Sequence, residues 1–230
     1  MPAPPDAARF RCTSRFEAKI RRLGYCFVAG CDEAGRGALL GPLYAAAVIL
    51  DPTRLIRGLD DSKRLTPAER ADLAPRIRAR ALAFAVVPVP AAEVDALNVY
   101  QASRRAMIQA LETLRPAPDY VLTDAMRLAG WGDPREFTLP HRAIIHGDAR
   151  SVSIAAASIL AKTERDARLV ELDCLYPQYC LASNKGYGTP DHLKGLREHG
   201  PCPEHRRTFA PVKCHDLPLL AGLPESLTIA

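Results

Sequence analysis

Long apolar runs are absent from this chain of 230 residues. Its most apolar stretch, residues 43–50, is only about half as long as the roughly 20 residues that a membrane-spanning helix needs. Residues 1–22 also lack the apolar core of a secretory signal peptide and contain several arginines instead. We therefore expect a soluble, cytoplasmic protein with no membrane partner.

Cysteine pairs of the Cys-x-x-Cys kind are missing as well, although the chain has seven cysteines. An odd number of thiols in a chain without an export signal favours reduced cysteines that pack as small apolar side chains. One alternative is a zinc site, because candidate ligands gather near the C-terminal end at His199, Cys202, His205, Cys214 and His215. Their spacing matches no standard zinc pattern, so we favour reduced thiols.

Internal repeats are absent too, and the 20 prolines are spread along the chain, which excludes a fibrous protein. Hydrophobic residues make up 48% and charged residues 25% of the chain, as in ordinary globular proteins. The length favours one large α/β domain with tails over two full domains. We expect a partly disordered tail over residues 1–24, one folded domain over residues 25–215 and a second tail over residues 216–230.

The net charge of +5 is distributed unevenly along the chain. Between residues 192 and 215, basic side chains outnumber acidic ones, and four histidines accompany them. The basic residues of this stretch are Lys194, Arg197, Arg206, Arg207 and Lys213. A basic region of this kind indicates a polyanionic partner, and nucleic acid is the partner we expect.

Strands and helices alternate after two initial strands. Apolar runs predict strands over residues 25–31, 44–50, 82–89, 120–123 and 143–146. Helical patterns cover residues 15–23, 67–80, 91–114, 152–172 and 191–198, and Thr66 with Glu69 forms a capping box before the second of these. The order predicts one mixed sheet with helices on its faces, in which sites form at strand ends.

Acidic residues follow three of these strands. Asp32 and Glu33 follow the first, Asp124 follows residues 120–123, and Asp148 lies just after residues 143–146. Carboxylates that meet at one edge of a sheet repel each other unless a cation lies between them. Mg²⁺ and Mn²⁺ prefer such oxygen ligands, so the sequence predicts a divalent metal site. Alternation along a strand would separate Asp32 from Glu33, so we expect the strand to stop at Asp32.

A Gly-flanked arginine, Gly35-Arg36-Gly37, comes two residues after the acidic pair. One interpretation is a flexible turn. The other is a main chain that approaches a ligand closely beside a phosphate-binding guanidinium, and its position favours this second interpretation.

Six segments in order resemble type 2 ribonuclease H (ribonuclease HII). The first runs from Cys31 through Pro42, and the second is Asp61 to Leu65. The others are residues 120–124, residues 147–166, residues 176–192 and residues 205–211. Three positions depart from the usual family pattern without removing an acid, namely Ala38, Ala125 and Thr208.

The resemblance implies a ribonuclease H-like α/β fold, a mixed sheet flanked by helices with a C-terminal helical extension. It implies a metal-dependent endonuclease that cleaves RNA in RNA–DNA hybrids and incises 5′ to single ribonucleotides in duplex DNA, for ribonucleotide removal. Its four acids carry over onto Asp32, Glu33, Asp124 and Asp148, which would hold two Mg²⁺ or Mn²⁺ ions about 4 Å apart and yield 5′-phosphate and 3′-hydroxyl ends.

Substrate-binding positions also follow from the resemblance. Gly35, Arg36 and Gly37 would sense the ribose 2′-hydroxyl, and Tyr187 would recognise the RNA–DNA junction. The candidates for phosphate contacts are Lys63, Lys162 and Lys185. We expect Asp166 to pair with Lys162 four residues earlier on a helix, and Asp61 to orient Lys63 or cap a turn.

Two other functions stay open. One is a different nuclease of the same fold, such as a junction resolvase, and the other is a nucleic-acid binder without catalysis. The presence of all four acids disfavours the binder, and we expect a monomeric enzyme.

Overall fold

A mixed five-stranded sheet forms the centre of the protein. The computed structural model describes residues 12–129 and 137–214. The strand order is β3-β2-β1-β4-β5. The strands are β1 (Val28–Ala34), β2 (Leu43–Leu50), β3 (Ala81–Val89), β4 (Tyr120–Asp124) and β5 (His141–Ile144). The first three pair antiparallel, whereas β4 runs parallel to both β1 and β5. The expected α/β architecture is confirmed.

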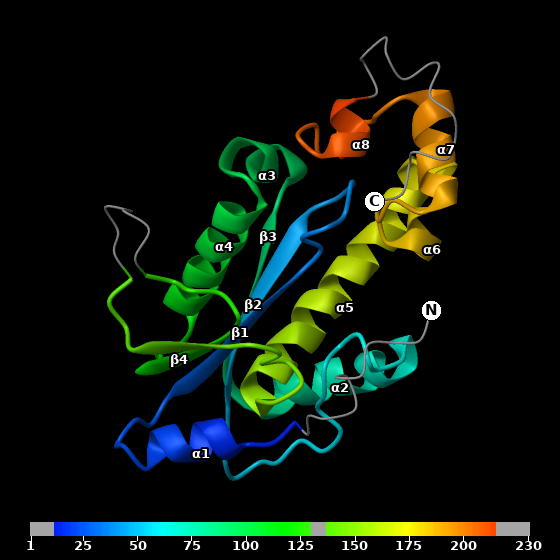
Figure 1. Ribbon diagram of the computed structural model, residues 1–230. Helices are drawn as coiled ribbons and strands as arrows, with labels where there is room; N and C mark the ends of the chain where they lie inside the picture. Colours follow the sequence, from blue (N-terminus) through cyan, green and yellow to red (C-terminus); the bar gives the residue numbers. More distant parts are fainter. Residues whose placement is uncertain (1–11, 130–136, 215–230) are drawn as a thin grey trace.

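Helices cover both faces of this sheet (Figure 1). On one face lie α2 (Pro67–Arg80) and α5 (Val152–Leu175), packed on the β2 side chains of Ala46 and Val48. The other face is covered by α3 (Ala91–Leu97) and α4 (Val99–Thr113). The C-terminal extension contains η1 (Pro177–Tyr179), α6 (Leu181–Asn184), α7 (Pro190–His199) and α8 (Ala210–Lys213), which continue beyond the end of α5.

Local sequence patterns explain several helix boundaries. Thr66 accepts a hydrogen bond from the Glu69 main chain at 3.2 Å, and Glu69 accepts one from the Thr66 main chain at 2.7 Å, so the capping box is confirmed. The expected helix over residues 91–114 is instead two helices. Asn98 separates them with φ +66°, and its side chain accepts hydrogen bonds from the first turn of α4, which stabilises this break.

The last strand begins and ends two residues earlier than expected. β5 is His141–Ile144, because it pairs in parallel register with β4 from Val121 to Asp124. Ile145 is exposed and His146 has φ +55°, so the chain has already turned there. This turn leads directly to Asp148.

A short helix, α1 (Arg15–Arg21), packs onto the sheet within the expected N-terminal tail. Its Glu17 is buried and accepts hydrogen bonds from the Ser151 hydroxyl at 2.5 Å and the Ser153 main chain at 2.9 Å. Residues 12–24 are therefore connected to the start of α5, next to the Asp148 loop. The remainder of both expected tails lies outside the described residues.

Close approach of α5 to β1 depends on Gly30. A Cβ atom at this position would lie 2.1 Å from the main-chain carbon of Ser153. The absence of a side chain lets the helix reach the strand two residues before Asp32. Helix α5 is thereby placed beside the acidic strand end.

Candidate functional site

Three aspartates meet where neighbouring strands end. Asp32 lies on β1, Asp124 is the last residue of the parallel strand β4, and Asp148 follows the turn after β5. One carboxylate oxygen from each comes within 4.8 Å of the other two. The structure therefore brings together three of the four acids that the sequence analysis selected.

Glu33 lies beside this aspartate cluster but on the other face of the sheet. The expected end of the strand at Asp32 is wrong, because β1 continues to Ala34 in register with β2. Asp32 is paired with Ala46 and Glu33 with Ala45, and these two alanines belong to core clusters on opposite faces. Glu33 Oε1 accepts a hydrogen bond from Arg36 at 3.1 Å, whereas its buried Oε2 has no partner within the described part of the chain.

Main-chain hydrogen bonds orient the three aspartates. The amide of Gly147 donates to Asp124 at 2.7 Å, and those of Glu33 and Ala149 donate to Asp32 and Asp148 at 2.8 and 2.9 Å. These contacts join the β4 end to the Asp148 loop and hold the carboxylates toward each other.

Burial and mutual repulsion act strongly on these acids. Burial, followed by the charges of Glu33 and Asp124, raises the pKa of Asp32 well above its ordinary range. Burial, Asp124 and Asp61 raise the pKa of Asp148 to about 7. Burial also raises the pKa of Asp124, although the Gly147 amide acts in the opposite direction. A divalent cation among these oxygens would offset the repulsion, so the donor set fits such an ion.

Lys63 and Asp61 extend the electrostatic environment of the cluster. Burial alone would lower the pKa of the Lys63 ammonium, but Asp148, Asp32, Asp61 and Asp124 raise it instead. Asp61 accepts a hydrogen bond from the Lys63 main chain at 2.9 Å, which confirms its expected turn-capping role. Asp61 also raises the pKa of Asp148, an effect that no spacing in the sequence indicated.

Two serines connect the segment Asp61 to Leu65 to the aspartate cluster, a role that the sequence did not reveal. The hydroxyl of Ser158 on α5 hydrogen-bonds to Asp32 and lowers its pKa, against the larger raising effects. It also lies 2.8 Å from the hydroxyl of Ser62, and both serines are buried. Both stand in segments already matched to a family, but nothing in their spacing indicated that they would meet.

The Gly35-Arg36-Gly37 segment is held closely by its surroundings. Gly35 has φ +93°, and a Cβ atom there would lie 2.0 Å from Arg165 Nε. A Cβ atom on Gly37 would lie 3.9 Å from the ring of Tyr187. Arg36 is half-exposed and ion-paired with Glu33 at 3.1 Å. The turn and the tyrosine, expected to read the substrate together, are neighbours in the structure.

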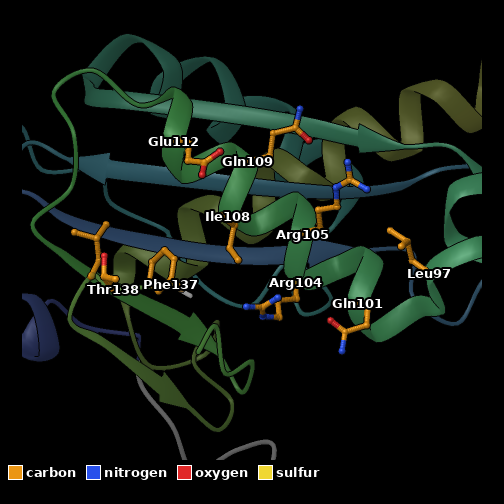
Figure 2. Close-up of a pocket in the computed structure, with 10 residues that line it drawn as sticks. Leu97, Gln101, Arg104, Arg105, Ile108, Gln109, Glu112, Phe137 and Thr138 are labelled. Atoms are coloured by element: carbon orange, nitrogen blue, oxygen red, sulfur yellow. The ribbon is translucent and has the colours of Figure 1, made fainter. Parts of the chain in front are cut away.

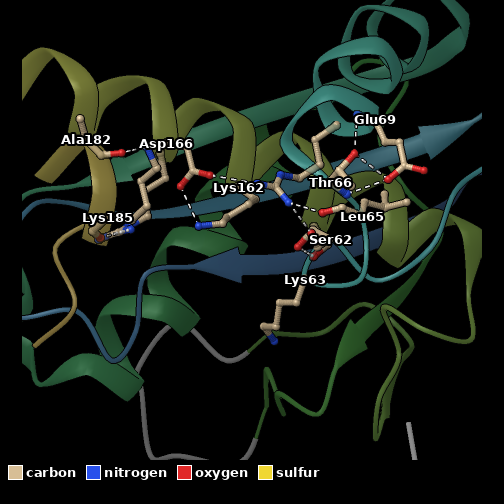
Figure 3. A network of polar contacts seen from close by, with 12 residues as sticks. Ser62, Lys63, Leu65, Thr66, Glu69, Lys162, Asp166, Ala182 and Lys185 are labelled. Atoms are coloured by element: carbon tan, nitrogen blue, oxygen red, sulfur yellow. Dashed lines mark hydrogen bonds and ion pairs between the residues drawn. The ribbon is translucent and has the colours of Figure 1, made fainter. Parts of the chain in front are cut away.

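The three candidate lysines have different surroundings (Figure 3). Lys162 donates to Asp166 at 2.6 Å, so the expected helical pair is confirmed, and Arg70 adds a contact to Asp166 at 3.4 Å. Lys185 donates to the carbonyl of Ala182 at 2.6 Å. Lys63 extends away from this network. Lys63 therefore has the strongest electrostatic connection to the aspartates.

The zinc alternative is not supported by the described residues. Over residues 12–129 and 137–214, the group that could hold a metal is the aspartate cluster. His205 accepts from the Cys202 main chain at 3.0 Å and contacts His192 at 3.1 Å between their Nε2 atoms. His199 is exposed beside Glu198, and His215 lies outside the described residues.

Two buried arginines were also missed. Arg206 is buried, although it belongs to the basic stretch that we expected to contact nucleic acid, and Arg165 on α5 is buried as well. Arg206 donates to the carbonyls of Arg36 and Gly41 at 2.9 to 3.2 Å. No local sequence pattern predicts that Arg206 is buried, because the carbonyls to which it donates are more than 160 residues away in the chain.

A separate pocket of about 720 Å³ lies against α4 (Figure 2). It is lined by Arg104, Gln101 and Ile108 of α4 and by Phe137 to Leu139, and contains none of the clustered aspartates. Its chemistry is unrelated to the acidic site. Within the described residues, no helix is long and apolar enough to cross a membrane.

Comparisons with known proteins agree on one family. The sequence model of the family described as "Ribonuclease HII" matches residues 29–212. A ribonuclease HII of Solibacter usitatus is 49% identical over 211 residues, covering 92% of this chain and 90% of the relative. That of Bordetella pertussis is 50% identical over 191 residues, covering 83% of this chain and 92% of the relative.

Solved structures share the fold. The ribonuclease H2 of Pyrococcus horikoshii OT3 has a TM-score of 0.69 and 26% identity, covering 83% of this chain and 97% of that one. A ribonuclease HIII called Bst-RNase HIII, solved in complex with Mn²⁺, has a TM-score of 0.61 over 85% of this chain and 70% of that one. Its 19% identity shows a shared fold alone.

Proposed function

This chain belongs to the ribonuclease HII family, and on that premise we propose that Asp32, Glu33, Asp124 and Asp148 form its catalytic metal site. The protein is a metal-dependent endoribonuclease that cleaves RNA in RNA–DNA hybrids. The observation that supports the site is the meeting of three aspartate oxygens within 4.8 Å at adjacent strand ends.

The donor set suits two divalent ions of the Mg²⁺ or Mn²⁺ type. Asp32, Asp124 and Asp148 offer clustered oxygens, and Glu33 adds a buried Oε2 without a partner within the described residues. When bound, such ions supply an activated water and stabilise the leaving 3′-oxygen, which yields 5′-phosphate and 3′-hydroxyl ends. The chain's contribution is to hold the carboxylates in place through the amides of Gly147 and Ala149.

Lys63 supplies positive charge beside the acids. The carboxylates raise the pKa of its ammonium above the ordinary value, and this ammonium can contact a backbone phosphate. Lys162 and Lys185 are weaker candidates for the same task, since each already donates to a group of the protein.

Recognition of ribose rests on the segment Gly35 to Gly37 and on Tyr187. Only the 2′-hydroxyl separates RNA from DNA in a given base pair, and the main chain of Gly35, Arg36 and Gly37 can approach it closely. Tyr187 is half-exposed beside Gly37 and can stack on the deoxyribose after the junction. We infer that the enzyme incises 5′ to single ribonucleotides in duplex DNA and so serves ribonucleotide removal.

We propose that one domain carries this activity as a monomer in the cytoplasm. The family match over residues 29–212 lies within the expected domain of residues 25–215, which supports these bounds. Size-exclusion chromatography with light scattering tests the oligomeric state, and a dimer would contradict it.

The experiment that tests this function uses three matched duplexes. One has a single ribonucleotide in DNA, one is all DNA with the same sequence, and one is a continuous RNA–DNA hybrid. We expect cleavage of the first and third with Mg²⁺ or Mn²⁺, none of the all-DNA duplex, and none after chelation. Cleavage of a four-way DNA junction without cleavage of the ribonucleotide substrates would support the resolvase alternative instead.

A further inference from the structure

Arg165 occupies a central position between the two segments that contact the substrate in the proposed function. It lies on α5, the helix between the sheet and the C-terminal extension (Figure 1), and is fully buried. Its Nε donates to the carbonyl of Pro42 at 3.1 Å and its Nη2 to that of Leu40 at 3.3 Å. Its Nη1 donates to the carbonyl of Lys185 at 2.8 Å. One guanidinium thus connects the chain after Gly37 to the chain before Tyr187.

The same group lies against Tyr187 and Gly35. The guanidinium carbon is 5.5 Å from the centre of the Tyr187 ring, a distance at which a cation attracts an aromatic face. Gly35 passes so near that a Cβ atom on it would lie 2.0 Å from Arg165 Nε. Arg165 therefore lies close to both the Gly35 turn and the ring of Tyr187.

Main-chain contacts complete the connection. The amides of Leu39 and Leu40 donate to the carbonyl of Gly186 at 2.8 and 3.3 Å. Gly186 has φ +78°, and a Cβ atom there would lie 2.4 Å from the carbonyl oxygen of Leu40. The two segments are therefore joined directly by main-chain hydrogen bonds and are in close contact.

Arginine is chemically suited to this position. Its planar guanidinium donates in three fixed directions, whereas a lysine ammonium is a point charge that could not reach the three carbonyls in the same geometry. Its hydrogen bonds within the described chain go to main-chain carbonyls, and the neighbouring Asp166 acts on its charge only through space. The ring of Tyr187 lies close to this positive charge, and Tyr187 acts on it more strongly than Asp166 or Tyr44 does.

We propose that Arg165 is a positioning residue for recognition of the RNA–DNA junction, because it holds Tyr187 and the Gly35–Gly37 turn at a fixed separation. The inference rests on the proposed function, in which this turn senses the 2′-hydroxyl and Tyr187 meets the next sugar. Arg165 itself touches no substrate. It acts by fixing the separation between the two, so its effect requires Tyr187 as well as the turn.

The test compares Arg165→Lys with Arg104→Lys. Arg104 is also a buried arginine that donates to a carbonyl, that of Leu128 at 2.8 Å, but it lies on α4. We expect Arg165→Lys to lower kcat/KM on the single-ribonucleotide duplex at least about tenfold, the range of one lost aromatic contact. On the continuous hybrid its loss should stay below about threefold, since every sugar there carries a 2′-hydroxyl. Arg104→Lys should affect both substrates equally.

A double variant shows whether Arg165 acts through Tyr187. In the Tyr187→Ala background, Arg165→Lys should lower kcat/KM on the single-ribonucleotide duplex by less than about twofold further. Equal losses on both substrates, or a full additional loss in this background, would overturn the inference and leave Arg165 with a purely structural role. If Arg165→Lys is unfolded at the assay temperature, Arg165→Gln, which is neutral and shorter, takes its place in the same comparison.

Failure of this inference and failure of the proposed function give different results. If Tyr187→Ala matches the unaltered enzyme on both substrates, Tyr187 does not recognise the junction, and the proposed role is wrong. If Tyr187→Ala loses activity while Arg165→Lys behaves like Arg104→Lys, the recognition stands and the positioning role of Arg165 is wrong.

Discussion

Two clusters of buried charge lie near each other in this protein, and the chain satisfies them differently. The aspartates Asp32, Asp124 and Asp148 repel each other, and burial and that repulsion raise their pKa values. The arginines Arg165 and Arg206 are buried too, but their donors reach main-chain carbonyls of the substrate-facing segments. Burial lowers the pKa of Arg206 to about 10, with Arg165 as a further cause.

This difference indicates that the aspartates serve the catalytic chemistry, whereas the arginines position the loops. Carboxylates whose repulsion the chain does not relieve are prepared for cations from outside, and so for catalysis. Guanidinium groups that are fully buried and donate to main-chain carbonyls are not accessible to a phosphate, and they hold the loops instead. Substitutions in the aspartate cluster should therefore lower kcat, whereas substitutions at the arginines should lower kcat/KM on the single-ribonucleotide duplex.

The largest effect is expected at the acidic cluster. Asp124→Asn keeps the shape of the side chain and an oxygen for the Gly147 amide but removes the charge that binds metal. We expect kcat to fall more than about 100-fold, beyond the loss typical of groups that only support a metal ligand. Cleavage of the hybrid in Mg²⁺ measures this, with circular dichroism to check the fold, and an unaltered rate would remove Asp124 from the site.

Gly35→Ala should break the arginine cluster. The new methyl group would collide with Arg165, and φ +93° is strained for alanine. We expect kcat/KM on the single-ribonucleotide duplex to fall at least about tenfold. Gly24→Ala is the matched control, because Gly24 has φ +99° with nothing within 4 Å of the added atom. Equal activity of the two variants would show that the collision has no consequence.

Asp148→Asn should stabilise the metal-free protein above neutral pH. The folded-state pKa of about 7 lies above the ordinary value of 3.8, so the native carboxyl costs stability as pH rises through that interval. The gain in Tm should be absent near pH 3 and reach its full size above pH 7. We expect a full gain of a few degrees, because a stability change of 1 kcal/mol shifts the Tm of a domain of this size by about 2–4 °C.

Thermal unfolding from pH 3 to 8 measures this change, with Glu112→Gln on the exposed side of α4 as control. Mn²⁺ should raise the Tm of the unaltered protein more than that of Asp148→Asn. A variant that is less stable at pH 8 without metal would contradict the repulsion that we describe.

The smallest expected effect concerns the salt dependence of substrate binding, which should depend on exposed cations and not on buried ones. Lys194, Arg197 and Arg207 are exposed, so they can release counterions on contact with phosphates, whereas Arg165 and Arg206 are buried. Lys194→Ala should reduce the slope of log affinity against log salt by at most about 0.9. Arg165→Lys should leave the slope unchanged. Fluorescence anisotropy with a labelled hybrid measures both, and a slope near zero for the unaltered protein would contradict phosphate contacts altogether.

Local patterns in the sequence were sufficient for much of the fold. The capping box at Thr66, the helix to Arg80 and the buried strand before Asp124 depend on contacts within a few residues, which spacing reveals. The break at Asn98 is also local, but an isolated asparagine within a helical pattern does not predict a residue with positive φ.

The sequence by itself determined that acids follow three strands, and that the matched segments belong to one enzyme family. Only the tertiary structure decided that the side chains of Asp32 and Glu33 point to opposite faces of the sheet, because pairing with β2 extends β1 to Ala34. The burial of Arg165 and Arg206 was likewise decided by the tertiary structure alone. Their partners include the carbonyls of Pro42, Leu40 and Gly41, which lie more than 120 residues away in the chain. Periodicity records neighbours in sequence, whereas the burial of a charge depends on groups that only folding brings together.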